Sequence, residues 1–462
     1  MRHPQSYSGK RVVILGLARS GVAVAELFHR YGADVVVNDK KERSLCPEAD
    51  GLSALGISVI CGDHPDDLID DSVALVVKNP GIPYKIPPIQ RALELGIEVV
   101  TEVEVAYHIA VSPMIGITGS NGKTTTTTLV HLMLQEDGFG AVAAGNIGRA
   151  LTEAALQTKR EDWLVVELSS FQLKGTVDFR PRISCLLNLY ETHLDYHGTM
   201  EDYGESKAKL VANQLEDDIA VLNWDDPFCR GLMSSVKARL FPFSAKEKLE
   251  RGVYIREGMI VYSDGMNAAK DIMPVAEIGI RGSFNAENAL AAAACALSAG
   301  VHPEAIRKVL TEFKGVEHRL ELVRELRGVS YYNNAKATNP AATIKTIEAF
   351  DEKIVLICGG LDRGSDYMEL VPVFERSVKA VIALGETREK LLRVAELAGV
   401  KQRVSINTSE PEEALRQAVQ AAASAAEEGE VVLLSPACAS WDMFPSYETR
   451  GSMFKHSVHT LL

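Results

Sequence analysis

Short apolar runs, each followed by a helical pattern, recur along this chain. Residues 11–15 and 34–38 are predicted strands on either side of a helix over 23–28. Uninterrupted apolar runs of this length are typical of parallel strands that are buried on both faces. Further strands are predicted at 75–78, 98–100, 115–117, 163–168, 183–188, 354–357, 380–384 and 431–434. The pattern indicates α/β units in series, with residues 240–280 as an irregular, short-stranded insert.

The strand at 115–117 ends in a glycine-rich loop. The loop is Gly119-Ser-Asn-Gly-Lys-Thr124, and an apolar helical pattern follows it. Glycines let backbone N–H groups turn toward a phosphate, and a helix N-terminus adds partial positive charge. Lys123 would reach the terminal phosphates, and the Thr124 hydroxyl would hold Mg²⁺. Ile117 stands where the strict pattern has its first glycine, so an ordinary strand–turn–helix stays an alternative.

The first α/β unit has a partial dinucleotide-binding signature. Its strand runs into Gly16-Leu-Ala-Arg-Ser-Gly21, and Asp39 stands at the end of the next strand. Ala18 replaces the glycine that lets the backbone approach a pyrophosphate, which disfavours NAD. A site for another nucleotide, with Asp39 accepting hydrogen bonds, is at least as plausible. The rigid turn Asn79-Pro-Gly-Ile-Pro83 is either part of that site or a simple corner.

Other polar residues leave two interpretations open. Glu167 ends a predicted strand and suits Mg²⁺, but a carboxylate can also simply end a buried strand. His193 lies among carboxylates after the next strand. It is either a metal ligand or an ordinary surface histidine. Lys207 and Lys209 fall in a predicted helix over 200–214 and are expected to be solvated. Asn285-Ala-Glu-Asn288 is expected to cap an alanine-rich helix.

Composition narrows the class of protein. At 462 residues, about three domains are expected. The 49 Lys and Arg against 62 Asp and Glu give a net charge of −13, which argues against nucleic-acid partners. The seven scattered cysteines are expected to be reduced thiols. We find no apolar leader and no run of the ~18 residues that span a membrane, so we expect a cytoplasmic protein without membrane insertion.

Six motifs occur in a fixed order over the whole chain. They are Thr118-Gly-Ser-Asn-Gly-Lys-Thr-Thr125, Glu167-Leu-Ser-Ser-Phe-Gln-Leu173, His193-Leu-Asp195, Phe313-Lys-Gly-Val-Glu-His-Arg319, Lys336-Ala-Thr-Asn339 and Leu434-Ser-Pro-Ala-Cys-Ala-Ser440. Together they resemble the Mur ligase family of ATP-dependent amide-forming enzymes. The resemblance implies an α/β fold of three domains: a Rossmann-like UDP-substrate domain over 1–101, a central P-loop ATPase domain with a mostly parallel sheet over 102–315, and a Rossmann-like amino-acid domain over 316–462.

The resemblance also implies roles for individual residues. Those expected at ATP are Gly119, Ser120, Asn121, Gly122, Lys123, Thr124, Thr125, Asn288, His318, Arg319 and Asn334. Two Mg²⁺ ions would be held by Thr124, Glu167, His193 and a carbamylated Lys207. The UDP substrate would contact Arg19, Ser20, Asp39, Gly81, Asn146, Ser169 and Gln172. Glutamate would contact Lys336, Thr338, Arg363, Ser440 and Tyr447, and catalysis would involve Lys123, His193, Lys207 and Lys336.

The activity implied is addition of D-glutamate to UDP-N-acetylmuramoyl-L-alanine by a monomer in peptidoglycan synthesis. The chain departs from the family pattern in four places: Asn334 replaces an aspartate, Ala335 a serine, Thr192 an acid and Arg363 a lysine. Asn334 can still accept a hydrogen bond from a ribose hydroxyl, and Arg363 can clamp a carboxylate with two hydrogen bonds. The alternatives are another ligase of the superfamily, such as a folylpolyglutamate synthase, a nucleotide-dependent regulatory protein, or an NAD oxidoreductase.

Overall fold

The first sheet is parallel throughout and has the strand order β3-β2-β1-β4-β5. Its strands are β1 Arg11–Leu15, β2 Asp34–Asp39, β3 Ser58–Cys61, β4 Val73–Lys78 and β5 Val99–Val100. One face packs against α1 (Arg19–Arg30) and α2 (Glu48–Ala54), and the other packs against α3 (Pro87–Glu94). The strand order reverses at β1, which places a ligand crevice at the carboxyl ends of β1 and β4.

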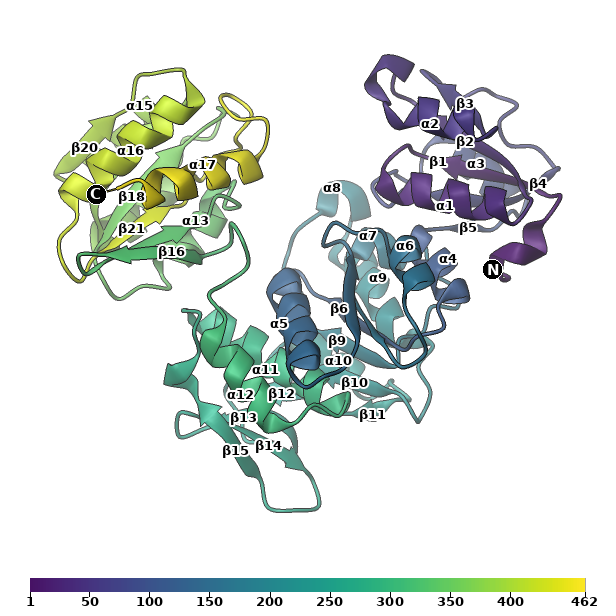
Figure 1. Ribbon diagram of the computed structural model, residues 1–462, viewed down its shortest axis with the longest axis horizontal. Coiled ribbons are helices and arrows are strands. Elements are labelled where there is room, and N and C mark those ends of the chain that lie inside the picture. The colour runs from purple at the N-terminus through teal and green to yellow at the C-terminus, as the bar shows by residue number, and fades with distance from the viewer. Residues whose placement is uncertain (462) are drawn as a thin grey trace. The chain divides into compact units, whose positions relative to one another are not determined.

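The central sheet is also parallel and has β6 in its middle, in the order β11-β10-β9-β6-β8-β7. Its strands are β6 Met114–Thr118, β7 Ala141–Gly145, β8 Trp163–Glu167, β9 Ile183–Leu186, β10 Ile219–Leu222 and β11 Arg239–Leu240. Its helices are α4 Glu102–Ile109, α5 Lys123–Glu136, α6 Leu151–Gln157, α7 Ser170–Lys174, α8 Leu194–His197, α9 Met200–Ala212, α10 Pro227–Leu232, α11 Ser283–Ser298 and α12 Pro303–Glu312. Helix α5 follows β6 through the glycine loop (Figure 1).

One local prediction in this part of the chain was half right and another was wrong. The segment over 240–280 is short-stranded, as predicted, but it is not irregular: it forms a four-stranded sheet of β12 Phe243–Ser244, β13 Arg251–Arg256, β14 Met259–Asp264 and β15 Lys270–Pro274. Polar residues at the strand ends interrupt the apolar pattern. The alanine-rich helix begins at Ser283, so Asn285 and Asn288 lie within it and do not cap it.

The last sheet has the order β16-β17-β21-β18-β19-β20 and is parallel except for the β16–β17 pair. Its strands are β16 Glu321–Leu326, β17 Val329–Asn333, β18 Ile354–Gly359, β19 Val378–Leu384, β20 Gln402–Ser405 and β21 Val431–Leu434. Its helices are α13 Pro340–Ile347, α14 Val371–Ser377, α15 Arg388–Leu397, α16 Pro411–Ala425 and α17 Tyr447–His459. Helices α13 to α15 pack on one face, and α16 and α17 pack on the other.

This computed structural model describes residues 1–461 and confirms the predicted α/β class with Rossmann-like, mostly parallel sheets. The chain divides into two compact units. The first unit is Met1–Glu277 with Glu287–Leu310, and the second is Ile278–Ala286 with the chain from Thr311 on. All seven cysteines are free, as predicted. Among residues 1–461 we find no helix with the length and apolar character that crossing a bilayer requires.

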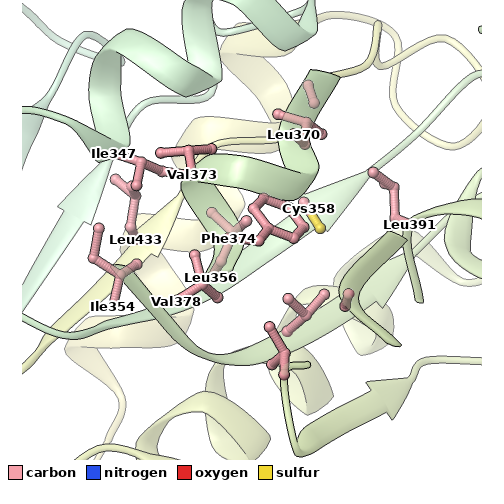
Figure 2. Close-up of a cluster of buried hydrophobic side chains, with 14 of the residues drawn as sticks. Ile347, Ile354, Leu356, Cys358, Leu370, Val373, Phe374, Val378, Leu391 and Leu433 are labelled. Atoms are coloured by element: carbon pink, nitrogen blue, oxygen red, sulfur yellow. The ribbon is translucent and has the colours of Figure 1, made fainter. Parts of the chain in front are cut away.

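The core between the last sheet and α13 to α15 generates a stability prediction. Leu356 of β18 is completely buried among Phe374, Leu433 and their neighbours (Figure 2). We expect Leu356→Ala to lower the free energy of unfolding of this unit by about 2–5 kcal/mol, because it removes buried methyl groups and leaves a cavity. The control is Leu397→Ala, whose side chain is 49% exposed. Urea-dependent hydrogen exchange of β18 amides measures the change, and equal losses in the two variants would contradict the packing shown here.

Candidate functional site

The glycine loop between β6 and α5 is shaped for close approach by other groups. Gly122 has φ +85° and precedes the first residue of α5. A Cβ at this position would lie 2.1 Å from Oδ1 of Asn288. Both the conformation and the space therefore require glycine, since other residues rarely adopt such a φ. The contact also brings Asn288, from the second turn of α11, against the predicted phosphate loop.

The segment that follows β9 fixes the rest of this loop. The backbone N–H of Asn121 donates to Oδ1 of Asn188 at 2.9 Å, and Ser120 Oγ accepts from the N–H of Tyr190 at 2.9 Å. Lys123 folds back so that its Nζ donates to the carbonyls of Gly119 at 2.8 Å and Ser120 at 3.0 Å. The loop is thus preorganised, and the ammonium group of Lys123 lies against its backbone.

Glu167 is buried with an incomplete set of partners. It lies at the end of β8, paired in register with Ile117 of β6, and its side chain is 1% exposed. Oε1 accepts a hydrogen bond from Nδ2 of Asn146 at 2.8 Å. Oε2 is buried and has no hydrogen-bond partner among the described residues. A buried carboxylate oxygen without a partner is costly, and a hard divalent cation such as Mg²⁺ would satisfy it.

Lys207 is also buried, so the expectation of a solvated lysine was wrong. It is 1% exposed, and its Nζ donates to the carbonyl of Gly119 at 2.9 Å and to Thr118 Oγ1 at 3.3 Å. Tyr203, Lys207 and Leu210 share one buried face of α9, which contacts β6. Burial, and secondarily the charge of Lys123, lowers the pKa of Lys207 well below its ordinary value. The amine is therefore driven toward its neutral form.

Two histidines stand at the two ends of α8. His193 precedes the helix with a left-handed φ of 59° and is exposed. Its pKa is lowered by partial desolvation and then by the charges of Lys123 and Lys207. His197, which sequence reasoning missed, contacts Asp202 through Nδ1 at 2.7 Å and Ser170 Oγ through Nε2 at 3.0 Å. The only sequence signal for it was its spacing of four residues from His193.

The residues predicted at the UDP substrate lie at strand ends and helix starts of the first compact unit. Asp39 accepts from the backbone N–H of Leu17 at 2.7 Å and of Lys41 at 2.9 Å. Ser20 Oγ donates to Asn79 Oδ1 at 2.9 Å, which ties α1 to the turn that contains Gly81. Because Ser20, Asp39 and Gly81 follow β1, β2 and β4 in turn, they lie along the carboxyl edge of the first sheet.

The other four residues predicted at the UDP substrate are Arg19, which contacts a loop of the central sheet from α1, and Asn146, Ser169 and Gln172, which belong to the central sheet's own loops and helices. Arg19 Nη1 donates to the carbonyl of Gly148 at 2.9 Å, which connects α1 to the loop after β7. Ser169 and Gln172 form a capping box at the start of α7, with their side chains 2.9 Å apart. The capping box fixes the start of α7 three residues after Glu167.

Lys78 is a buried residue of this region that sequence reasoning missed. It ends β4 with 1% exposure, and its Nζ donates to the carbonyl of Pro80 at 3.1 Å and to Tyr196 OH at 3.2 Å. The ring of Tyr84 lies 4.7 Å from the same nitrogen. Burial, with a smaller contribution from Lys174, lowers the pKa of Lys78 to about 7. An apolar run that ends in lysine gives no sign of this burial.

In the second compact unit, the predicted nucleotide residues lie close to β17. His318 is 5% exposed with a left-handed φ of 63°, and its Nδ1 lies 2.9 Å from Asn333 Nδ2. Asn334 Oδ1 accepts from the N–H of Leu320 at 3.2 Å, and its Nδ2 donates to Thr346 Oγ1 at 2.6 Å. Asn334 therefore supports the loop that carries His318 and Arg319.

The predicted glutamate residues lie in the loops that follow β17, β18 and β21, except Tyr447, which begins α17. Lys336 Nζ donates to Tyr447 OH at 2.9 Å and lies 4.8 Å from the centre of its ring. Thr338 follows in the same loop as Lys336. Ser440 is 2% exposed, whereas Arg363 is exposed in the loop after β18. Parallel strands direct these three loops to one edge of the sheet.

Comparison with known families and proteins gives full-length matches. Residues 10–101 match the Mur ligase MurD-like N-terminal domain, residues 117–296 the Mur ligase middle domain, and residues 318–438 the Mur ligase glutamate ligase domain. A UDP-N-acetylmuramoylalanine--D-glutamate ligase of Geobacillus sp. (strain WCH70) is 48% identical, and one of Bacillus subtilis (strain 168) is 44% identical. Each alignment covers 100% of both proteins.

Solved structures show the same fold at low identity. MurF from Acinetobacter baumannii aligns over 96% of this chain and 93% of its own, with 18% identity and a TM-score of 0.62. The UDP-N-acetylmuramate-alanine ligase MurC of Thermotoga maritima aligns over 98% of this chain and 99% of its own, with 19% identity and a TM-score of 0.57. These similarities support the three-domain architecture that the sequence predicted.

The buried Lys78 generates a prediction on pH dependence. Its folded-state pKa of about 7 lies below the ordinary 10.5, so between these values the unfolded chain binds more protons. The free energy of unfolding should therefore rise with pH across this window, by on the order of a few kcal/mol from this group. In Lys78→Met this contribution disappears, so wild type should gain stability relative to the variant between pH 7 and pH 9.5.

Urea unfolding at the two pH values measures the free energy of unfolding of wild type and of Lys78→Met. Contributions that both proteins share cancel when the two are subtracted. The exposed Lys85 provides a control in the neighbouring turn, because Lys85→Met should follow wild type at both pH values. Parallel stability profiles of wild type and Lys78→Met would contradict a buried lysine with a lowered pKa.

Proposed function

This chain belongs to the Mur ligase family, and we propose that it joins D-glutamate to UDP-N-acetylmuramoyl-L-alanine with cleavage of ATP, in peptidoglycan synthesis. One observation of the site carries the chemistry: the phosphate loop lies beside Glu167, whose buried oxygen is left for a cation. Relatives with this named activity are 44–48% identical to the chain over its full length. We place the protein in the cytoplasm and propose that it acts as a monomer.

Three domains would share the substrates. We propose residues 1–101 for the uridine diphosphate part, 102–315 for ATP and 316–462 for the incoming amino acid. The N–H groups at the start of α5, from Lys123 to Thr125, and the side chains of Lys123 and Asn288 would hold the ATP phosphates. The residues of the second unit expected at ATP are His318, Arg319 and Asn334. Asn334 also supports the loop that carries the other two, through its hydrogen bond with the N–H of Leu320.

The UDP substrate and glutamate would be bound at strand ends. The proposed contacts of the UDP substrate are Arg19, Ser20, Asp39, Gly81, Asn146, Ser169 and Gln172. The proposed contacts of glutamate are Lys336, Thr338, Arg363, Ser440 and Tyr447. Several of these side chains already hydrogen-bond one another, so each domain presents a partly ordered surface to its ligand.

The reaction requires activation of a carboxylate, which is a poor electrophile. The alanyl carboxylate oxygen attacks the γ-phosphorus of ATP, and the bond to the bridging oxygen breaks to release ADP. The glutamate amine then attacks the acyl carbon of the resulting acyl phosphate, loses a proton, and expels inorganic phosphate. In the first step two anions meet, and the Lys123 ammonium with the loop N–H groups offsets their repulsion. Exclusion of water would protect the acyl phosphate from hydrolysis.

The donor set fits magnesium. Thr124 and Glu167 would hold one Mg²⁺, and His193 with a carbamylated Lys207 would hold a second. The bound ions would neutralise phosphate charge as it develops. A buried lysine whose amine is driven to the neutral form is nucleophilic toward CO₂, and the resulting carbamate is an anionic oxygen donor. An unmodified Lys207 ammonium would instead repel a cation. A second Mg²⁺ at this position would therefore require the carbamate.

Phosphate release from ATP tests the activity. Release should require both UDP-N-acetylmuramoyl-L-alanine and an amino acid, and D-glutamate should be preferred in a screen of amino acids. Lys123→Ala should abolish the release, because the Lys123 ammonium offsets charge mainly during transfer. Turnover of Lys123→Ala within about tenfold of wild type, a barrier change of only ~1.4 kcal/mol, would contradict the assignment. Release that is independent of the UDP substrate would contradict the proposed reaction.

Lys207 provides a second test. We expect Lys207→Ala to lose nearly all activity and to recover part of it in acetate, because a small carboxylate could replace the carbamate oxygens. Lys209 is the matched control: its Nζ donates to the carbonyls of Lys174 at 2.7 Å and Thr176 at 2.9 Å. Lys209→Met should therefore cost stability but give no response to acetate. Full activity of Lys207→Ala without added carboxylate would exclude the carbamate.

A further inference from the structure

Trp441 is an exposed aromatic side chain directly after a residue of the proposed glutamate site. Its side chain is 66% exposed, whereas the preceding Ser440 is 2% exposed. A single exposed apolar residue is ordinary by itself. A specific role therefore needs evidence of what the ring contacts and of how firmly the ring is held.

The turn that carries Trp441 is fixed on both sides. The carbonyl of Ser440 accepts from the N–H of Met443 at 3.2 Å and of Phe444 at 2.8 Å. Phe444 is 2% exposed and packs into the core beneath α16 and α17. Asp442 Oδ2 accepts from the N–H of Glu386 at 3.1 Å. The indole is thus presented by an ordered turn, and not by a free loop.

The guanidinium of Arg363 lies over this indole. Its central carbon is 5.1 Å from the ring centre, within the range of a cation–π contact. The Arg363 loop is itself anchored, because the N–H of Leu361 donates to the carbonyl of Ala439 at 2.9 Å and that of Gly364 to Asp362 Oδ1 at 2.9 Å. Within residues 1–461 Arg363 forms no ion pair, so its charge is not neutralised while its position is constrained.

We propose that Trp441 is a positioning residue, which holds the guanidinium plane of Arg363 for a side-chain carboxylate of the incoming amino acid. The inference rests on the proposed function, since it assumes that Arg363 binds glutamate. A fork of two N–H groups grips a carboxylate only when the guanidinium plane is correctly oriented. A free arginine would lose rotamer freedom on binding, and stacking on a fixed ring reduces that loss beforehand.

This arrangement also explains why arginine functions here in place of the lysine that is usual in the family. A guanidinium is flat and weakly hydrated, so it can stack on an aromatic face while its edge remains available for hydrogen bonding. An ammonium on a flexible stem has no plane to orient and would gain less from the ring. The pair of Trp441 and Arg363 is therefore expected to act as one unit.

Steady-state kinetics of the full-length enzyme test the proposal. Trp441→Ala should raise KM for D-glutamate by about 2–5-fold, the size of one exposed cation–π contact. KM for ATP and kcat should stay within about twofold, because the stacking affects binding and not transfer. Trp441→Phe should restore most of the affinity. Leu397→Ala, which removes another exposed apolar side chain of this unit, should leave all three constants unchanged.

A double-mutant cycle separates positioning from other roles. With Arg363→Ala or Arg363→Lys already present, adding Trp441→Ala should raise KM for D-glutamate little further. An equal increase in every background, or an unchanged KM in Trp441→Ala, would overturn the proposal and leave Trp441 as a surface residue or a partner contact. If Arg363→Ala leaves KM for D-glutamate unchanged, the positioning role is wrong while the ligase activity stands. Absence of D-glutamate-dependent phosphate release from wild type would instead refute the proposed function.

Discussion

The central sheet depends on one electrostatic constraint, namely that two ionisable side chains are buried where β6 meets its glycine loop. Burying an isolated charge costs several kcal/mol, so each group must be paired or neutralised. Glu167 satisfies one oxygen with Asn146, and Lys207 donates to Thr118 and Gly119 while its pKa falls. The second oxygen of Glu167 has no hydrogen-bond partner among the described residues. In the proposed enzyme, magnesium would bind that oxygen and the carbamate formed on Lys207, which links the stability of the site to the presence of its ligands.

The same loop shows why close packing and function are inseparable here. Gly122 leaves no room for a Cβ because Asn288 occupies the space. Asn188 accepts from the N–H of Asn121, and the N–H of Tyr190 holds the Ser120 hydroxyl. A phosphate loop must direct N–H groups toward its ligand before that ligand arrives, since reorganisation during transfer would raise the barrier. The packed neighbours supply that rigidity, so residues that never touch ATP still determine how it would be held.

The sequence predicted this architecture well where strands are buried on both faces. Strands β1 and β21 have the predicted bounds, because continuous apolar runs report such burial directly. Strands β3 and β20 were missed because they lie at sheet edges, where β3 is half-buried and β20 is mostly exposed. The inner strands β10 and β17 were also missed, although most of their residues are buried. The phosphate loop was predictable from local spacing. Lys207 and Lys78 were not, because their burial depends on which helix face or domain packs against them, and residue type alone predicts solvation.

Arg450 shows the opposite solution to the problem that Lys207 presents. It is fully buried, and its guanidinium donates to the carbonyls of Ala335, Gly359 and Cys438 at 3.0–3.3 Å. Burial lowers its pKa only to about 10, so it remains charged at neutral pH. An arginine cannot be neutralised as a lysine can, and carbonyl dipoles must therefore stabilise it. Those carbonyls end or follow β17, β18 and β21, whose loops carry the proposed glutamate contacts. A permanent charge thus orders three loops at once, whereas the lowered pKa of Lys207 favours the neutral amine that the proposed carbamylation requires.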